Sequence, residues 1–305
     1  MNGGRRVTVV GEALVDLLWP AGARTARAVP GGSPANVAVG LHRLGRPVTL
    51  VTAWGDDAPG ALVGAHLAGT GVPVRRVPAE PPGRTIVALA YLDANGGAEY
   101  DFLAAWDPLE LPVPADTAVL HTGSLAVVIE PGAFRVLELC RRQRELGRTV
   151  VADLNVRPAV QPDPDSYRSV ARRVAGAVDV LKASEEDLAW LYPGTRPADA
   201  ARTLLGFGPR LAVVTLGAAG ALALMGRSEV RVSAPAAEVV DTVGAGDSFQ
   251  SALLDALAER DGVPTDPAEL ARILAGCAAA AALTCTRVGA DPPTRADMTA
   301  LRTRP

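Results

Sequence analysis

Short runs of apolar and β-branched residues alternate along this chain with stretches whose apolar positions follow helical spacing. The apolar runs predict strands over residues 7–10, 48–52, 119–125, 149–154, 178–182 and 211–216. The helical spacing predicts helices over residues 35–44, 58–70 and 268–283, and a further helix that begins at residue 248. Strands that alternate with helices in this way are typical of an α/β protein with a mainly parallel sheet.

One pair of strands departs from this alternation and predicts a hairpin. The runs at residues 84–92 and 99–103 flank Asp93-Ala94-Asn95-Gly96-Gly97, which consists of turn-forming residues. Residues 20–30 are rich in Pro, Gly, Ala and Arg, which predicts a loop or the edge of a lid. We therefore expect a small β lid built from segments at about 12–30 and 84–105. No internal repeat or low-complexity linker divides the chain, so residues 1–305 are expected to form one domain.

Composition excludes several classes of protein. The chain is 49% hydrophobic, which suffices for a sizeable core, and its net charge of −3 provides no field for gripping nucleic acid. The alanine-rich run at residues 278–283 is too short to cross a membrane, and the first residues lack the apolar segment of a signal peptide. Cys140, Cys277 and Cys285 lack metal-ligand spacing and are expected to be reduced core thiols. We expect a soluble, cytoplasmic protein without nucleic-acid or membrane partners.

The most informative polar segment lies at residues 239–249. Its two valines predict the end of an extended segment, and Gly244-Ala245-Gly246 leads from a turn into the next helix. Backbone N–H groups at the beginning of a helix, beside glycines, form a site for an anion. Asp247 would repel that anion unless its carboxylate faces a second reactant. This arrangement suits transfer of an anionic group to a hydroxyl that Asp247 deprotonates. The alternative is that Asp247 only caps the helix.

Three further polar side chains stand at candidate ligand positions. Asp16 interrupts an apolar run, where burying an unpaired acid costs free energy. It is therefore a candidate for binding two hydroxyl groups, and the alternative is that it faces solvent. The amide of Asn36 is able to donate to and accept from hydroxyls, unless it is ordinary helix-end polarity. Arg157 follows a strand, where ligands bind in open parallel sheets. It would clamp a phosphate or substrate oxygen, or else lie on the surface.

Two long motifs, some 200 residues apart, carry a resemblance to a known family. Asp-Thr-Val-Gly-Ala-Gly-Asp-Ser-Phe at residues 241–249 resembles the C-terminal signature of the PfkB/ribokinase family of sugar and nucleoside kinases. Residues 31–45, which begin Gly-Gly-Ser-Pro-Ala-Asn, resemble its N-terminal signature, and residues 153–158 and 214–217 match further segments. The resemblance covers essentially the whole chain and is closest to the fructokinase branch. It implies a three-layer α/β/α ribokinase-like fold with a mainly parallel sheet and a small β lid.

The resemblance also implies a reaction and its site residues. The reaction is transfer of the γ-phosphate of ATP to a primary hydroxyl of a small sugar, with fructose as the expected substrate. The general base is Asp247, and the anion hole is formed by Gly244, Ala245 and Gly246. The sugar is expected to contact Asp16, Gly32 and Asn36, with Arg157 as a further candidate. The nucleotide is expected to contact Ser184, Asp187, Thr215 and Gly217.

Metal ions and assembly follow from the same resemblance. Ser184 and Asp187 are a shortened form of an Asn-x-x-Glu segment that assists Mg²⁺ through water. A monovalent cation, K⁺, is implied beside the anion hole, with oxygen ligands from Asp241, Val243, Thr284, Arg287 and Gly289. Whether K⁺ is required, and whether a homodimer forms through the β lid, are left open.

Other functions stay open at this stage. Residues 103–106 lack the arginine that fructokinases commonly carry there, so a 2-keto-3-deoxygluconate kinase, or another sugar or nucleoside kinase of the family, is an alternative. A dinucleotide oxidoreductase would use Gly244-Ala245-Gly246 as its pyrophosphate turn, but the early glycine fingerprint of that class is missing. The third alternative is a non-catalytic sugar-binding sensor, and the intact Asp247 favours an enzyme instead.

Overall fold

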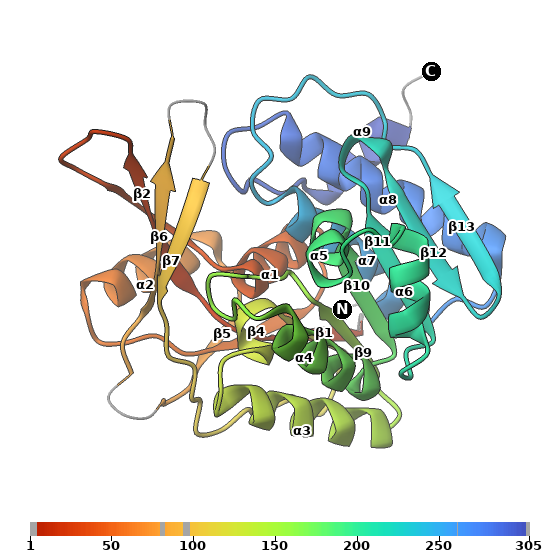
Figure 1. The fold of residues 1–305 in the computed structure, drawn as a ribbon, viewed down its shortest axis with the longest axis horizontal. Helices are drawn as coiled ribbons and strands as arrows, with labels where there is room; N and C mark the ends of the chain where they lie inside the picture. The colour runs from red at the N-terminus through yellow and green to blue at the C-terminus, as the bar shows by residue number, and fades with distance from the viewer. Residues whose placement is uncertain (1–4, 80–82, 94–97, 261, 303–305) are drawn as a thin grey trace.

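A nine-stranded sheet runs through the centre of the molecule (Figure 1). The computed structural model describes residues 5–79, 83–93, 98–260 and 262–302. The strand order is β13-β12-β11-β10-β9-β8-β1-β4-β5. The strands are β1 (Arg6–Val10), β4 (Val48–Thr52), β5 (Val74–Arg76), β8 (Thr117–Gly123), β9 (Thr149–Asp153), β10 (Val180–Ser184), β11 (Leu211–Thr215), β12 (Ala221–Met225) and β13 (Ser228–Val232). All pairs from β5 to β11 are parallel, which confirms the predicted α/β class.

Helices cover both faces of this sheet, so the fold has the three predicted layers. One face packs against α3 (Gly132–Glu145), α4 (Pro164–Ala177), α5 (Glu185–Leu191) and α6 (Pro197–Leu205). The opposite face packs against α1 (Ser33–Arg43), α2 (Ala58–Thr70), α7 (Ala245–Arg260) and α8 (Pro267–Cys285). A short helix, α9 (Arg295–Arg302), follows α8 at the C-terminal end (Figure 1).

The alternation of side chains along β8, β9 and β10 decides which of them face α7. Val119, Val151 and Val180 belong to the core on the α7 side of the sheet. A strand places residues i and i+2 on the same face. Two residues further along these strands, at their carboxyl ends, the side chains are polar: His121, Asp153 and Lys182. The sheet therefore presents a row of polar groups toward the beginning of α7, where the sequence predicts an anion site.

The small β lid is present as a separate four-stranded sheet with the order β3-β2-β6-β7. Its strands are β2 (Leu14–Pro20), β3 (Arg27–Gly31), β6 (Ile86–Leu92) and β7 (Ala98–Leu103). The antiparallel pairing of β6 and β7 confirms the predicted hairpin, whose turn at residues 94–97 lies outside the described residues. Figure 1 shows this sheet at one side of the molecule, beside α2.

Three details differ from the sequence prediction. The two valines of the anion-site motif, Val239 and Val240, lie in an irregular segment rather than at the end of a strand. Helix α7 begins at Ala245, three residues earlier than its apolar spacing indicates, because the glycine-containing motif forms its first turn. The antiparallel hairpin of β12 and β13 at the sheet edge was not predicted.

Helix α8 contains the alanine-rich run at residues 278–283 and is much longer than that run. Among the described residues, it is the one helix that is long and apolar enough to cross a membrane by length and composition alone. In the structure it packs in the core on the α7 side, with Leu270, Leu274 and Cys277 buried. The cysteines described are all free thiols, as predicted, and Cys140 and Cys277 are buried in the core. Cys285 differs from the prediction, because it lies at the C-terminal end of α8 and is only partly buried.

Candidate active site

Two helix N-termini meet at the carboxyl edge of the large sheet, and each depends on a glycine. Gly32 precedes α1 with φ 107°, and a Cβ atom there would lie 2.8 Å from the carbonyl oxygen of Glu12. Gly244 precedes α7 with φ 77°, and a Cβ atom there would lie 2.7 Å from the side chain of Ala290. Both positions combine a left-handed backbone with close contacts, so only glycine fits without strain.

Asp247 stands in the first turn of α7 and is held by α1. Its Oδ1 accepts a hydrogen bond from the Ser33 hydroxyl at 2.7 Å, and its Oδ2 accepts one from the Asn36 side-chain amide at 2.8 Å. The carboxylate thus accepts hydrogen bonds from the neighbouring helix. A helix cap would instead accept N–H groups of its own helix. Burial raises the pKa of Asp247, and the two hydrogen bonds from α1 oppose that rise.

The anion site at the beginning of α7 differs in one residue from the predicted set. The N–H group of Ala245 donates to the Thr242 carbonyl oxygen at 3.2 Å, and that of Ser248 donates to Gly244 at 2.9 Å. Between them, the N–H groups of Gly246 and Asp247 have no hydrogen-bond acceptor within the described part of the chain. These two amides, and that of Gly244, which also has no acceptor there, lie at the positive end of the helix dipole and are the groups free to bind an anion.

A buried lysine lies beneath this helix end, and sequence reasoning missed it. The Lys182 ammonium group is 2.5 Å from Asp153 Oδ2, and only 5% of each side chain is exposed. A Cβ atom on Gly246 would lie 3.9 Å from the Lys182 nitrogen, so the cation stands close to the anion site. The second oxygen of Asp153 is buried without a partner among the described residues. The available signals were that Lys182 is the only lysine and that it lies near a strand end.

Asp16 lies on the lid strand β2, where the charge of Arg157 acts on it. Burial raises the pKa of Asp16 to about 6; the charge of Arg157 lowers this pKa, and the charge of Asp247 raises it. Asp16 is therefore within electrostatic reach of both Arg157 and Asp247, although the three residues come from β2, the segment after β9, and α7. The Asp16 carboxylate lies against Gly31, where a Cβ atom would be 2.7 Å from Oδ2.

The residues predicted to contact the nucleotide lie along the ends of β10 and β11. Ser184 and Thr215 are paired across these two strands, and Gly217, with φ 51°, begins the 3₁₀ helix Gly217–Ala219. Asp187 makes more hydrogen bonds within the protein than its predicted role requires. It forms a capping box with Ser184, and its carboxylate accepts the N–H groups of Ser184 and Val156 at 2.8 and 2.7 Å. Its carboxylate thus joins the ends of β9 and β10.

The two loops predicted to bind a monovalent cation are linked directly. The N–H groups of Val240 and Asp241 donate to the Cys285 carbonyl oxygen at 2.8 and 3.2 Å. The Asp241 carboxylate accepts the N–H groups of Gly289 and Val243 at 2.8 and 3.0 Å, and these bonds lower its pKa. Together they hold the segment before α7 against the loop after α8.

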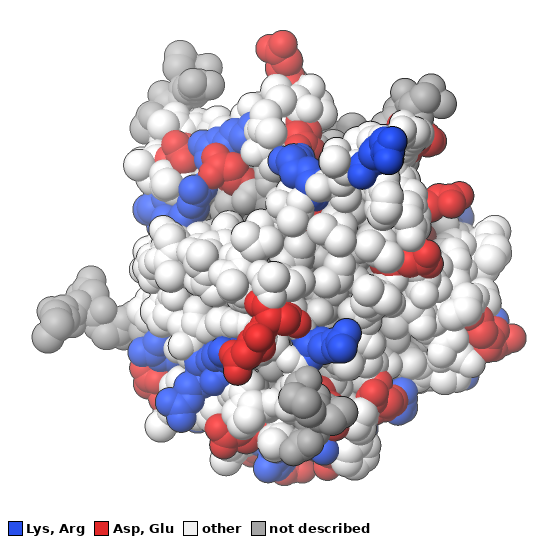
Figure 2. Space-filling model, turned by 90° about the vertical axis from the view of Figure 1, so that its left-hand side faces the viewer, with Lys and Arg blue, Asp and Glu red and all other residues white. Residues whose placement is uncertain are grey.

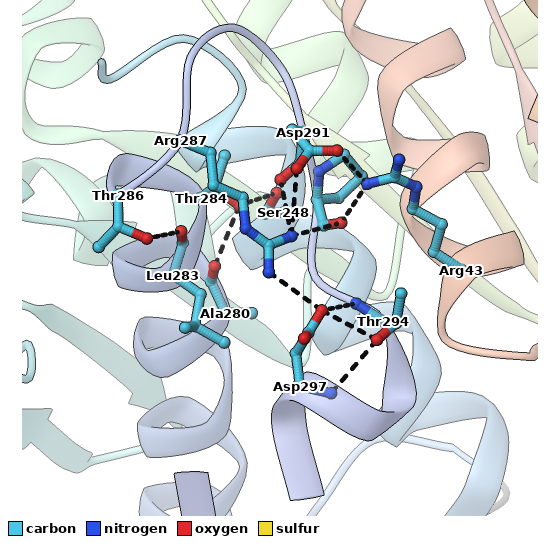
Figure 3. A network of polar contacts seen from close by, with 11 residues as sticks. Arg43, Ser248, Ala280, Leu283, Thr284, Thr286, Arg287, Asp291, Thr294 and Asp297 are labelled. Atoms are coloured by element: carbon cyan, nitrogen blue, oxygen red, sulfur yellow. Dashed lines mark hydrogen bonds and ion pairs between the residues drawn. The ribbon is translucent and has the colours of Figure 1, made fainter. Parts of the chain in front are cut away.

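The side chains of Thr284 and Arg287 are engaged elsewhere (Figure 3). The Thr284 hydroxyl forms hydrogen bonds with the Ser248 hydroxyl and the Ala280 carbonyl oxygen, and the Arg287 guanidinium group pairs with Asp291 and Asp297. Arg287 has no side-chain oxygen, so only its main-chain oxygen is available to a cation, whereas the Thr284 hydroxyl oxygen keeps its lone pairs. Within the described residues, no group of three or more His, Cys, Asp or Glu side chains is placed to hold a metal ion.

Asp247 thus lies next to helix amides that have no acceptor among the described residues, and close to the buried Lys182. Such a combination of groups suits transfer of an anionic group to a hydroxyl. Residues 5–297 match the family described as pfkB family carbohydrate kinase. The chain belongs to this family, which makes it a kinase. A fructokinase from Klebsiella pneumoniae is 35% identical over 300 residues, which cover 95% of each chain.

Solved structures agree with this assignment. A fructokinase double mutant from Vibrio cholerae O395, in fructose-, ADP- and potassium-bound form, has a TM-score of 0.79 and 28% identity, covering 97% of this chain and 98% of that one. Aminoimidazole riboside kinase from Salmonella enterica, complexed with aminoimidazole riboside and an ATP analogue, has a TM-score of 0.78 and 28% identity, covering 97% and 99%. The ribokinase-like fold expected from the sequence is thereby confirmed.

Proposed function

We propose that this kinase transfers the γ-phosphate of ATP to a primary hydroxyl of a small sugar, with fructose as the preferred acceptor. The observation that carries this proposal is the position of Asp247, held by Ser33 and Asn36 beside the free amides of α7. The similarity to fructokinases supports the choice of sugar. Residues 1–305 act as one kinase domain in this proposal, with the small sheet as its lid.

Each step has a group in the structure suited to it. Asp247 takes the proton of the acceptor hydroxyl as its oxygen forms a bond to the γ-phosphorus. The bond from that phosphorus to the β-phosphate oxygen breaks, and ADP leaves. The amides of Gly246 and Asp247, with Lys182 beneath them, face the charge on the transferred group. Asp16, Gly32 and Asn36 border the sugar, and Arg157 offers a positive charge at its edge.

The metal ions stay predictions. Mg²⁺ would neutralise phosphate oxygens, and it is usually held by phosphates and water with one or two carboxylates. Asp187 is the carboxylate expected to assist through water, although both of its oxygens already accept backbone N–H groups. No step above depends on that ion.

The substrate preference is the first test. We expect kcat/KM for fructose to exceed that for adenosine and for aminoimidazole riboside by about tenfold or more, because a site lined by groups that bond sugar hydroxyls discriminates between acceptors. The measurement is ATP consumption with a set of sugars, sugar acids and nucleosides. The Asp247→Asn variant, purified in the same way, serves as the control for contaminating kinases.

Other outcomes of this screen point to the alternatives. A preference for 2-keto-3-deoxygluconate would keep the reaction and change the sugar. A preference for a nucleoside would contradict the fructose assignment. Sugar binding without any ATP consumption would favour a non-catalytic sensor.

Potassium is the second test. We expect K⁺ to raise kcat, because the linked loops at Asp241 and Cys285 offer main-chain oxygens next to the anion site. Rates are compared in potassium and tetramethylammonium salts at equal ionic strength, which holds screening constant. Identical rates in the two salts would contradict a functional cation site.

Assembly and location also stay predictions. Figure 2 shows the side of the molecule that carries the lid, where arginines are scattered among acidic residues on a mainly uncharged surface. The lid strands expose large apolar side chains, namely Trp19, Tyr91, Tyr100 and Leu103. These side chains support a homodimer formed through the lid. The cytoplasmic location rests on the sequence alone.

A further inference from the structure

Ser33 makes a contact that the assigned roles do not explain. It is the first residue of α1, and its hydroxyl donates to Asp247 Oδ1 at 2.7 Å. Within the described residues this hydroxyl has no other hydrogen-bond partner. The Asn36 amide donates to the other oxygen of the same carboxylate. One donor from α1 is thus committed to each oxygen of Asp247.

On the proposed role of Asp247 as the base, we propose that Ser33 is a positioning residue: its hydroxyl fixes the orientation of the carboxylate and favours its ionised form. An ionised carboxylate offers about four lone-pair positions, so two donors leave room for the acceptor hydroxyl. Because one Asp247 oxygen accepts from Ser33 and the other accepts from Asn36, the plane of the carboxylate is fixed before the substrate binds. A hydrogen bond donated to the charged form stabilises that form.

The surroundings of Asp247 explain why this donor matters. Burial raises its pKa most, Ser33 and Asn36 lower it, and the nearby charges act in both directions. The charged groups that face the carboxylate or its neighbour on the lid are Asp153 of β9, Lys182 of β10, Asp16 of β2 and Arg157 after β9. Two of these are acids, which oppose ionisation. The two α1 donors, the Lys182 cation and the dipole of α7 act in the opposite direction and favour the charged form of the base.

The test is the dependence of kcat on pH. Asp247 must be ionised to take a proton, so activity falls as the pH falls through its pKa in the enzyme–substrate complex. Ser33→Ala removes a donor to the charged form and therefore raises this pKa. We expect the acidic limb, the pH range in which kcat falls as the pH falls, to move to higher pH by about one unit. A shift of this size corresponds to the loss of one hydrogen bond to a charged group. At pH values below both pKa values, kcat of the variant should be about tenfold lower than that of the parent protein. The KM for the sugar should change little.

Two control variants separate this role from packing. Ser33→Thr keeps the hydroxyl and should keep the limb in place. The hydroxyl of Ser251, one turn along α7, shares its proton between the Asp247 main-chain oxygen at 2.7 Å and the Val37 main-chain oxygen of α1 at 3.1 Å. Ser251→Ala thus loosens the contact between the same two helices without touching the carboxylate, and its limb should not move.

The outcomes distinguish this inference from the proposed function. An unmoved limb in Ser33→Ala, an equal shift in Ser251→Ala, or a change confined to the sugar KM would overturn the role of Ser33. If Ser33→Ala does not fold, Ser33→Cys replaces it, because a thiol is a weak donor. A fully active Asp247→Asn would instead overturn the base itself.

Discussion

Asp247→Asn is expected to lower kcat by about 10²–10⁴-fold, which is the usual contribution of a general base. Asparagine keeps the size of the side chain and one of the two acceptor oxygens that face α1, but it does not accept the proton of the sugar. We expect the melting temperature to stay close to that of the parent protein. Nucleotide affinity should hold or improve, since a negative charge beside the α7 amides is removed. Steady-state kinetics, thermal melts and ADP binding measure these three quantities.

A second aspartate provides the matched control. Asp266 is a true helix cap, because its carboxylate accepts the N–H groups of Ala268 and Glu269 at the beginning of α8. Asparagine caps nearly as well as aspartate, so Asp266→Asn should retain both activity and stability. Full activity in Asp247→Asn as well would place the two residues in the same class and contradict general-base catalysis.

The sequence predicts the buried parallel elements well, because their signals are local. Strand β4 and helix α2 match the predicted residues 48–52 and 58–70, the latter because Gly71, with φ 74°, ends the helix. The hairpin of β12 and β13 was missed for the opposite reason. Ala221–Met225 consists of alanine, leucine and methionine, which favour helix, and its extended form comes from pairing with β11.

In the candidate site, too, the local features were predictable from the sequence and the contacts between distant segments were not. Asp247, Gly32 and the turn before α7 stand in long motifs, so their positions were predictable from neighbouring residues. The contact of Ser33 with Asp247 joins residues 214 positions apart, and no periodicity within one element predicts such a partner. The engagement of Asp187 with Val156 and the burial of Lys182 likewise depend on how separate strands meet.

Lys182→Met is expected to have the largest effect on stability. The substitution leaves Asp153 buried without its partner, and breaking a buried pair in this way destabilises a protein by about 3–5 kcal/mol. Denaturant unfolding of the parent protein and the variant measures the change. A loss below about 1 kcal/mol would mean that the pair behaves as an exposed ion pair.

The double variant Lys182→Met/Asp153→Asn separates stability from chemistry. It removes both charges, so no unpaired ion is left, and we expect it to regain most of the lost stability. The cation beneath Gly246 is still absent, and removal of a preorganised group at a site of developing charge typically lowers kcat by about 10²–10³-fold. We therefore expect the double variant to be stable and slow. If its kcat returned with its stability, the pair would serve the fold alone, and the charge on the transferred phosphoryl group would be balanced by the α7 amides without Lys182.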